Sequence, residues 1–219
     1  MYKTTRLQSI LIQYKWPLSL CLFIPCVYGA DDNESWTSIG FEKNLPYSLK
    51  LEFEQELRLA DQLSTFKQTL SDISLSYKVF DDLRIQISYR NSTYENKNKQ
   101  RISIGSSYKY SLKPINLKYR ARFQRTFEVG DTSEDLIRNK FTIEYKLDKN
   151  IKPYVSSELF HPYDEDPVQL DEYRISFGLT VDIMKKNSIK IFYIFKKEDL
   201  TKSDPDEINV FGLDYSFKM

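Results

Sequence analysis

Apolar and polar residues alternate with a period of two along most of this chain. Over residues 102–112 the odd positions hold serine, glycine or lysine, and the even positions hold large residues except at Ser106. The segments 115–124 and 173–183 repeat this alternation. Because successive side chains of a strand point to opposite faces, the pattern predicts a sheet with one apolar and one polar surface.

Eleven segments with this pattern are predicted as strands. Residues 53–70 also fit a helical face, but the charges at Glu52, Glu54, Glu56 and Arg58 recur at every second position and favour a strand. Many segments have ten or more residues, which suits the roughly 9–11 residues that cross a bilayer at a tilt. The predicted strands are 36–44, 47–60, 66–79, 83–94, 101–112, 115–128, 137–147, 151–161, 170–183, 188–198 and 207–218.

Short connections alternate with longer polar ones, as in outer-membrane barrels with tight periplasmic turns and longer external loops. We therefore predict an all-β fold, a transmembrane antiparallel up-and-down β-barrel. Aromatic residues make up 15% and charged residues 29% of the chain, and a barrel between lipid and water needs both. The alternative is a soluble β-sandwich or lipocalin-like barrel, whose apolar faces would have to meet in one core.

The number of strands is the open point of this prediction. Eleven strands would close with two parallel neighbours, whereas bacterial barrels usually have an even number. We therefore expect about ten strands, with 36–44 outside the closed wall. Twelve is the alternative, if one strand has been merged or missed.

Residues 1–29 differ from the rest and predict a secretory signal peptide. Three basic residues and no acidic one accompany an apolar run over 16–27, and Val27 and Gly29 supply small residues for cleavage after Gly29. The domain organisation is then 1–29 signal peptide and 30–219 outer-membrane β-barrel. A spanning helix would need about 20 apolar residues, and two prolines interrupt this run.

Both cysteines, Cys21 and Cys26, lie in this first segment. A lipoprotein signal wants a small residue before its cysteine, and Leu20 and Pro25 stand there instead. Cleavage would leave a chain with neither a disulfide nor a thiolate metal site.

The end of the chain resembles the assembly signal of outer-membrane barrels, which is a glycine followed at fixed spacing by two aromatic residues. Gly212, Tyr215 and Phe217 hold those positions, although Val210 stands where a polar residue is usual. The resemblance implies that the barrel-assembly machinery is a partner.

A wider resemblance covers nearly all of the chain from Trp36 onward. Residues 36–43, 51–59, 138–141 and 153–160 resemble the family catalogued as domain of unknown function 2490. The resemblance implies an exported outer-membrane barrel of similar size, from a family found mostly in Bacteroidetes. It implies no activity and no catalytic residues.

The sequence offers little for catalysis or for a cofactor, and we expect neither a cofactor nor a metal site. Outer-membrane lipid hydrolases use serine with histidine, but Ser157 is roughly 13 Å from His161, the one histidine, along the predicted strand. A lipid hydrolase therefore ranks third among the functions considered. Asp204, Asp206 and Glu207, like Asp164, Glu165 and Asp166, are interpreted as solvated loop residues that divalent ions could bridge to lipopolysaccharide.

The polar face should line the lumen, with acidic residues on the early strands and basic residues next to them. If these charges pair across the lumen, they fill it, and the protein is a structural or surface-binding barrel. If they leave a narrow water channel, the protein is porin-like and passes small polar or anionic solutes. Expected partners are outer-membrane lipid and lipopolysaccharide, and not nucleic acid, because the net charge is +1. The predicted lumen residues are Glu52, Glu54, Glu56, Arg58, Asp72, Arg84, Arg90, Lys118, Arg120, Arg122, Glu144, Glu158 and Arg174.

Overall fold

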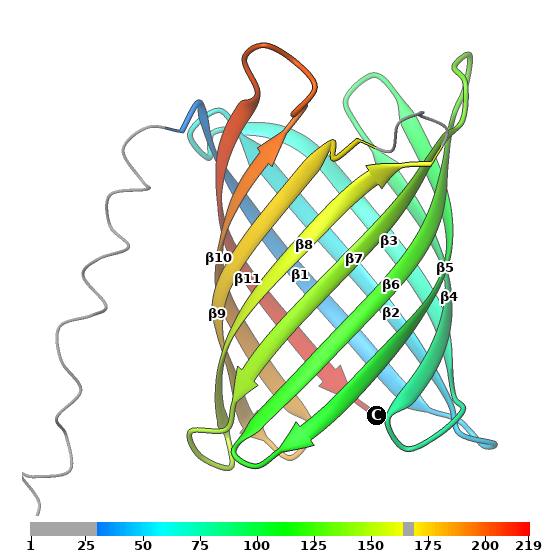
Figure 1. The fold of residues 1–219 in the computed structure, drawn as a ribbon, viewed down its shortest axis with the longest axis vertical. Coiled ribbons are helices and arrows are strands. Elements are labelled where there is room, and N and C mark those ends of the chain that lie inside the picture. Colours follow the sequence, from blue (N-terminus) through cyan, green and yellow to red (C-terminus); the bar gives the residue numbers. More distant parts are fainter. Residues whose placement is uncertain (1–29, 164–168) are drawn as a thin grey trace, which may run out of the picture.

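The computed structural model describes residues 30–163 and 169–219, which form a closed β-barrel (Figure 1). The predicted signal peptide and the acidic positions 164–166 lie outside the described residues. No helix within the described ranges is long and apolar enough to cross a membrane. The strands are β1 (Asp32–Asn44), β2 (Leu49–Ala60), β3 (Thr65–Lys78), β4 (Leu83–Thr93), β5 (Asn98–Leu112), β6 (Ile115–Glu128), β7 (Glu134–Tyr145), β8 (Ile151–Pro162), β9 (Glu172–Met184), β10 (Asn187–Glu198) and β11 (Asp206–Lys218).

Every strand pairs antiparallel with its neighbour in sequence, and β1 closes the barrel by pairing parallel with β11. This confirms the predicted up-and-down barrel, but the expectation of about ten strands, with 36–44 outside the wall, is wrong. Residues of β1 are paired with β2 on one edge and with β11 on the other, from Asp32↔Ile208 to Glu42↔Lys218. Leaving β1 out would expose unpaired backbone groups on two strands, which is costly wherever water is absent.

The two ends of the barrel differ in their connections. One end carries the turns 45–48, 79–82, 113–114, 146–150 and 185–186, and the other carries the connections 61–64, 94–97, 129–133, 163–171 and 199–205. We call these the short-turn end and the long-loop end. Figure 1 shows that β1 starts at the long-loop end, whereas the C-terminus lies at the short-turn end. The segment 53–70, which also fitted a helix, consists of β2, a turn and β3.

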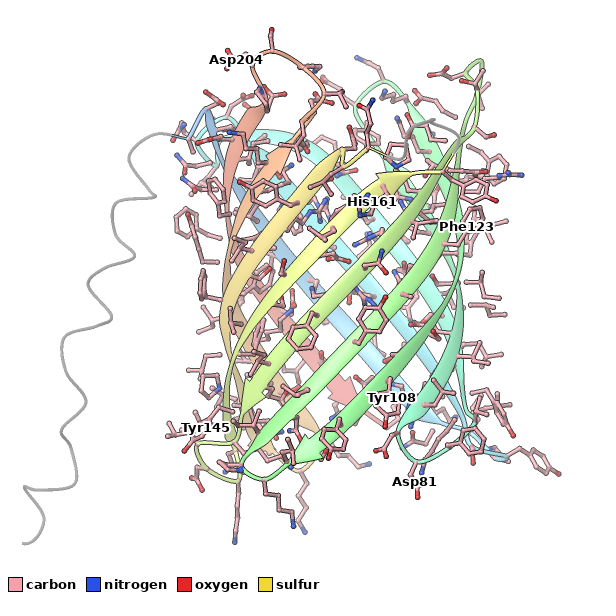
Figure 2. The ribbon with its side chains drawn as sticks, in the orientation of Figure 1. Asp81, Tyr108, Phe123, Tyr145, His161 and Asp204 are labelled. Carbon is pink, nitrogen blue, oxygen red and sulfur yellow. The ribbon has the colours of Figure 1, made fainter. Side chains whose placement is uncertain are left out.

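The outer surface of the barrel is apolar. Ile102 and Ile104 on β5 are 56% and 53% exposed, and large apolar side chains on the other strands are exposed in the same way. Aromatic side chains lie toward both ends, with Tyr108 and Tyr145 near the short-turn end and Phe123 near the long-loop end (Figure 2). This arrangement matches the apolar belt and aromatic girdles of membrane barrels.

Inside the barrel, one apolar cluster lies against the junction of β1 and β11. It consists of Trp36, Phe192, Ile194, Ile208 and Val210, which are buried and come from β1, β10 and β11. Parallel pairing is slightly weaker per residue than antiparallel pairing, so this cluster supports the weakest-paired edge of the wall.

Candidate functional site: a charged lumen

Within the part of the lumen formed by residues 30–163 and 169–219 lie two cavities, and all eleven strands contribute lining residues to each. The lower cavity, of about 590 Å³, is lined by residues such as Glu52, Lys118 and Glu144, toward the short-turn end. The upper cavity, of about 490 Å³, is lined by residues such as Arg58 and Arg174, toward the long-loop end. Both volumes are in the range of small-molecule sites.

Seven residues line both cavities and form the boundary between them, which we call the waist. Five of the seven are basic, one is a carboxylate and one is a tyrosine. The waist therefore presents mostly positive side chains to the lumen. Its members are Glu54, Arg90, Arg120, Arg138, Lys140, Tyr154 and Lys190.

Ion pairs hold most of the lumen charges, and they run along the wall. Glu158 on β8 is the centre of the largest group, with Arg138 Nη2 at 2.9 Å, Arg120 Nη2 at 3.2 Å and Lys140 Nζ at 3.5 Å. Arg90 on β4 pairs with Asp72 on β3 at 2.9 Å. Across the described residues, the lumen ion pairs join groups on one strand, on adjacent strands or on strands two apart. The charges pair, but along the wall rather than across the lumen.

A row of alternating arginine and aromatic side chains narrows the upper cavity. The guanidinium carbon of Arg58 lies 3.6 Å from the ring centre of Trp36, and that of Arg174 lies 5.3 Å from the same ring. Arg174 and Arg138 each lie 4.5 Å from the ring centre of Phe160. This aromatic–arginine row joins β2 and β1 to β9, β8 and β7, and contacts of this kind stabilise when desolvated.

Behind this row, a fully buried carboxylate anchors β1 to its surroundings. Glu34 accepts hydrogen bonds from Trp36 Nε1 and Lys67 Nζ, both at 2.7 Å, and from Lys196 Nζ at 3.4 Å. The three partners come from β1, β3 and β10. Glu34 therefore fixes Trp36, one of the two rings of the row, in place.

The family described as "Protein of unknown function (DUF2490)" matches residues 33–207. The chain belongs to the DUF2490 family. This confirms the resemblance seen in the sequence, whereas the expected source in Bacteroidetes stays a prediction. No curated protein matches the sequence.

The solved structures similar to this DUF2490 barrel include porins. The match to a NanC porin covers 86% of this chain and 99% of the porin chain, with a TM-score of 0.55 and 13% identity. The outer-membrane expressed OmpT of Vibrio cholerae has a TM-score of 0.43 and 10% identity, covering 70% of this chain and 53% of its own. An anion-selective porin from Comamonas acidovorans has a TM-score of 0.41 and 10% identity, and the match covers 81% of this chain and 54% of the porin. At such identities the likeness to the NanC porin shows the fold alone.

The lumen residues predicted from the DUF2490 sequence are distributed over both cavities, with one exception. Arg84, on β4, lines neither of them. The lower cavity holds Glu52, Asp72, Lys118, Arg122 and Glu144, the waist holds Glu54, Arg90 and Arg120, and the upper cavity holds Glu56, Arg58, Glu158 and Arg174.

Sequence reasoning missed several lumen residues. Arg101, Arg138 and Lys190 line the cavities and share the face of the predicted set, so strand parity alone could have found them. Trp36 and Phe160 were missed because aromatic residues were assigned to the outer face. Trp36 has the same parity as Glu34 and Ser38, which was the available signal.

The catalytic alternative gains no support from the described residues. His161 Nδ1 lies 3.3 Å from the carbonyl oxygen of Gln169, and no serine hydroxyl within the described ranges is hydrogen-bonded to its ring. Among these residues no group of three or more His, Cys, Asp or Glu side chains is placed to hold a metal ion. The low rank given to a lipid hydrolase stays a prediction.

At the end of the chain, Gly212, Tyr215 and Phe217 all lie on β11, the strand that closes the barrel. Tyr215 Oη donates a hydrogen bond to Asn187 Oδ1 on β10 at 2.5 Å. Their predicted role as an assembly signal, and the assembly machinery as a partner, stay predictions.

Proposed function

We propose that this protein is an outer-membrane channel for small solutes and that its lumen prefers anions. The observation that carries the proposal is the waist, where five basic side chains and one carboxylate lie between the two cavities. Low-dielectric walls around a narrow aqueous path concentrate the field of such charges. Rings of basic side chains are a common source of anion selectivity in pores.

The ion pairs within the waist leave it positive toward a solute. Arg120, Arg138 and Lys140 share the single carboxylate of Glu158, so their charges exceed that of their partner. A guanidinium has five donors, and an ion pair with one carboxylate oxygen uses only part of them. The side chains of Arg120 and Lys140 are 34% and 28% exposed, so their remaining donors are available to a passing anion.

The outer surface supports a place in the outer membrane. The strands have 11 to 15 residues, enough to cross a bilayer at a tilt, and their outward side chains form the apolar belt described above. A soluble barrel with this surface would expose a large apolar area to water, which monomeric soluble proteins avoid. The fold shared with a NanC porin agrees with this location.

Single-channel recording tests the proposal. The folded protein is inserted into planar bilayers under a KCl gradient, and the reversal potential is expected to show preference for chloride. In the double variant Arg120→Gln/Lys140→Gln, Glu158 keeps Arg138 as its partner while the waist loses two positive charges. The chloride-to-potassium permeability ratio should fall by roughly twofold or more in this variant.

Arg84→Gln on β4 is the control. This variant also removes a basic group, but at a position that lines neither cavity. It should leave the permeability ratio unchanged. Potassium preference in the unmodified protein, or an equal effect of Arg84→Gln, would contradict the assignment of selectivity to the waist.

A second candidate function is a closed barrel that acts through its loops, and the aromatic–arginine row favours it. The row joins opposite parts of the wall through Trp36 and Phe160 and could close the upper cavity. In that case the protein, shown to be folded by heat-modifiable gel migration, conducts no current, and Trp36→Ala opens a measurable conductance. A folded protein that conducts no current would contradict the proposed channel function.

A further inference from the structure

Two charged side chains of the lower cavity lack an ion-pair partner among the residues that the structure describes. Among the described residues, each of the other charged groups that line this cavity has an opposite charge within 4.0 Å: Glu42 and Glu52 pair with Lys50, Asp72 with Arg90, Lys118 with Glu144, Lys190 with Asp214, and Arg120, Arg138 and Lys140 with Glu158. The two exceptions are Glu54 and Arg122. One is an acid and the other a base, and they do not pair with each other.

Arg122 on β6 has donors to spare. Its one hydrogen bond in the described structure runs from Nη2 to Gln86 Oε1, a neutral acceptor, at 3.4 Å. Its register partner on β5 is Gly105, which has no side chain to cover the guanidinium. The guanidinium carries five N–H donors, so at least two remain for a bidentate bond to a carboxylate or another oxyanion.

Glu54 on β2 is the complementary group. Its carboxylate makes no hydrogen bond and no ion pair with any described residue, and it lines both the lower cavity and the waist. Its register partners are Gly40, which leaves space beside it, and Asp72, whose own carboxylate is engaged by Arg90. Asp72 adds negative potential on the same side, which favours a cation in front of Glu54.

The two groups line the cavity from separate parts of the wall. β2 and β6 are four strands apart in the closed wall of eleven. With strands about 4.8 Å apart and tilted by about 40°, their backbones are separated by roughly 20 Å across the lumen. The two side chains together do not span that distance, so their charged groups stay apart across the cavity.

We propose that the lower cavity binds a small zwitterion, with its ammonium group at Glu54 and its carboxylate at Arg122. An unpaired charge in a partly desolvated site is unfavourable, and a ligand with both charges satisfies the two groups together. The volume of about 590 Å³ suits an amino-acid-like solute with well-separated charges. This proposal rests on the proposed channel for the route of the solute, but binding itself requires no conduction.

Calorimetry on the folded protein in detergent micelles tests the proposal with three probes of equal chain length. 6-Aminohexanoate carries both charges, hexanoate only the negative one and hexylammonium only the positive one. We expect 6-aminohexanoate to bind at least about tenfold more tightly than either analogue, because only it makes both charge-assisted contacts.

Two neutral variants separate the contacts. Glu54→Gln should weaken 6-aminohexanoate by roughly tenfold and leave hexanoate unchanged, and Arg122→Gln should weaken 6-aminohexanoate and hexanoate alike. The matched controls are Glu128→Gln and Arg84→Gln, which change an inward-facing acid and base that line neither cavity. Both controls should bind 6-aminohexanoate like the unmodified protein, and gel migration should show that every variant is folded.

The outcomes separate this proposal from the channel. Hexanoate that binds as tightly as 6-aminohexanoate, with no effect of Glu54→Gln, would show an anion site and overturn the zwitterion. A conducting, chloride-selective protein that binds none of the probes would overturn this proposal and leave the channel intact. Binding with the expected variant pattern in a protein that conducts no current would support the site and reject the channel.

Discussion

At the residue scale, two glycines on the inner wall leave room for aromatic rings of the neighbouring strands. Gly212 lies opposite Phe192 in register, and Gly178 lies opposite Tyr154. A Cβ atom added to Gly212 would lie 1.9 Å from the Phe192 ring, and one added to Gly178 would lie 2.5 Å from the Tyr154 ring. In both cases the ring covers the backbone of the glycine, as aromatic residues do when they rescue a glycine in a sheet.

Gly212 therefore has a packing role besides its place in the predicted assembly signal. Phe192 belongs to the apolar cluster at the β1–β11 junction, so the flat position of its ring supports the closure of the barrel. The sequence shows the glycine and the aromatic residue, but their direct opposition depends on the register of β10 with β11, which the sequence pattern does not fix.

Gly212→Ala tests this role through stability. The added methyl group overlaps the Phe192 ring, and such overpacking costs about 1–3 kcal/mol, so the midpoint of urea unfolding should fall. The matched control is Gly40→Ala, because the nearest atom to an added Cβ there is at the ordinary distance of 3.6 Å. In a double-mutant cycle Phe192→Leu should remove most of the cost of Gly212→Ala, and additive effects would contradict the packing role.

At the element scale, the sequence predicted the strand segments well and the number of strands in the closed wall poorly. Each of the eleven predicted segments is a strand, with ends displaced by a few residues, because the alternation of apolar and polar residues reports a local property of the backbone. The number of strands in the closed wall depends on which edges pair, and this is a long-range property. The usual even number of bacterial barrels pointed to ten, whereas β1 is paired along both of its edges.

A disulfide across the closing pair tests the eleven-stranded wall. Thr37 and Leu213 are register partners on β1 and β11, so cysteines at both positions should cross-link on mild oxidation, with Cys21 and Cys26 replaced by alanine. The offset pair Thr37→Cys with Tyr215→Cys, displaced by roughly 7 Å along β11, should react far less. Non-reducing gels and mass spectrometry of the linked peptides give the yield. Equal yields for both pairs would show that β1 is not held in this register.

The candidate site could be predicted only as far as odd and even strand positions separate the inner face from the outer face. Parity placed Glu54 and Arg122 on the inner face, and both line the lower cavity, but parity gave no depth along the barrel axis. Arg84 shows the consequence, since it shares the inward parity of β4 and yet lines neither cavity. The membership of Arg138 and Lys190 in the waist depends on the tilt and stagger of all eleven strands, which a single sequence does not specify.

At the scale of the whole molecule, an odd number of strands places the two ends of the barrel chain on opposite sides. Asp31 lies next to Glu207 at the long-loop end, where its backbone N–H donates to the Glu207 carbonyl at 2.8 Å. Met219 lies beside Glu42 at the short-turn end, where its N–H donates to the Glu42 carbonyl, also at 2.8 Å. An even-stranded barrel would bring both ends to one side. The sides on which the two chain ends lie therefore show whether β1 completes the wall.

Labelling of single cysteines in intact outer membranes measures this sidedness. Asp204 lies in a connection at the long-loop end and Asp81 in a turn at the short-turn end (Figure 2). With a membrane-impermeant maleimide added from outside, Asp31→Cys and Asp204→Cys should be labelled alike, because both positions belong to the same end. Asp81→Cys should react only after the membrane is permeabilised. If Asp31→Cys instead follows Asp81→Cys, then β1 does not complete the wall in parallel with β11. The inner surface that forms the waist and the zwitterion site would then come from a different number of strands.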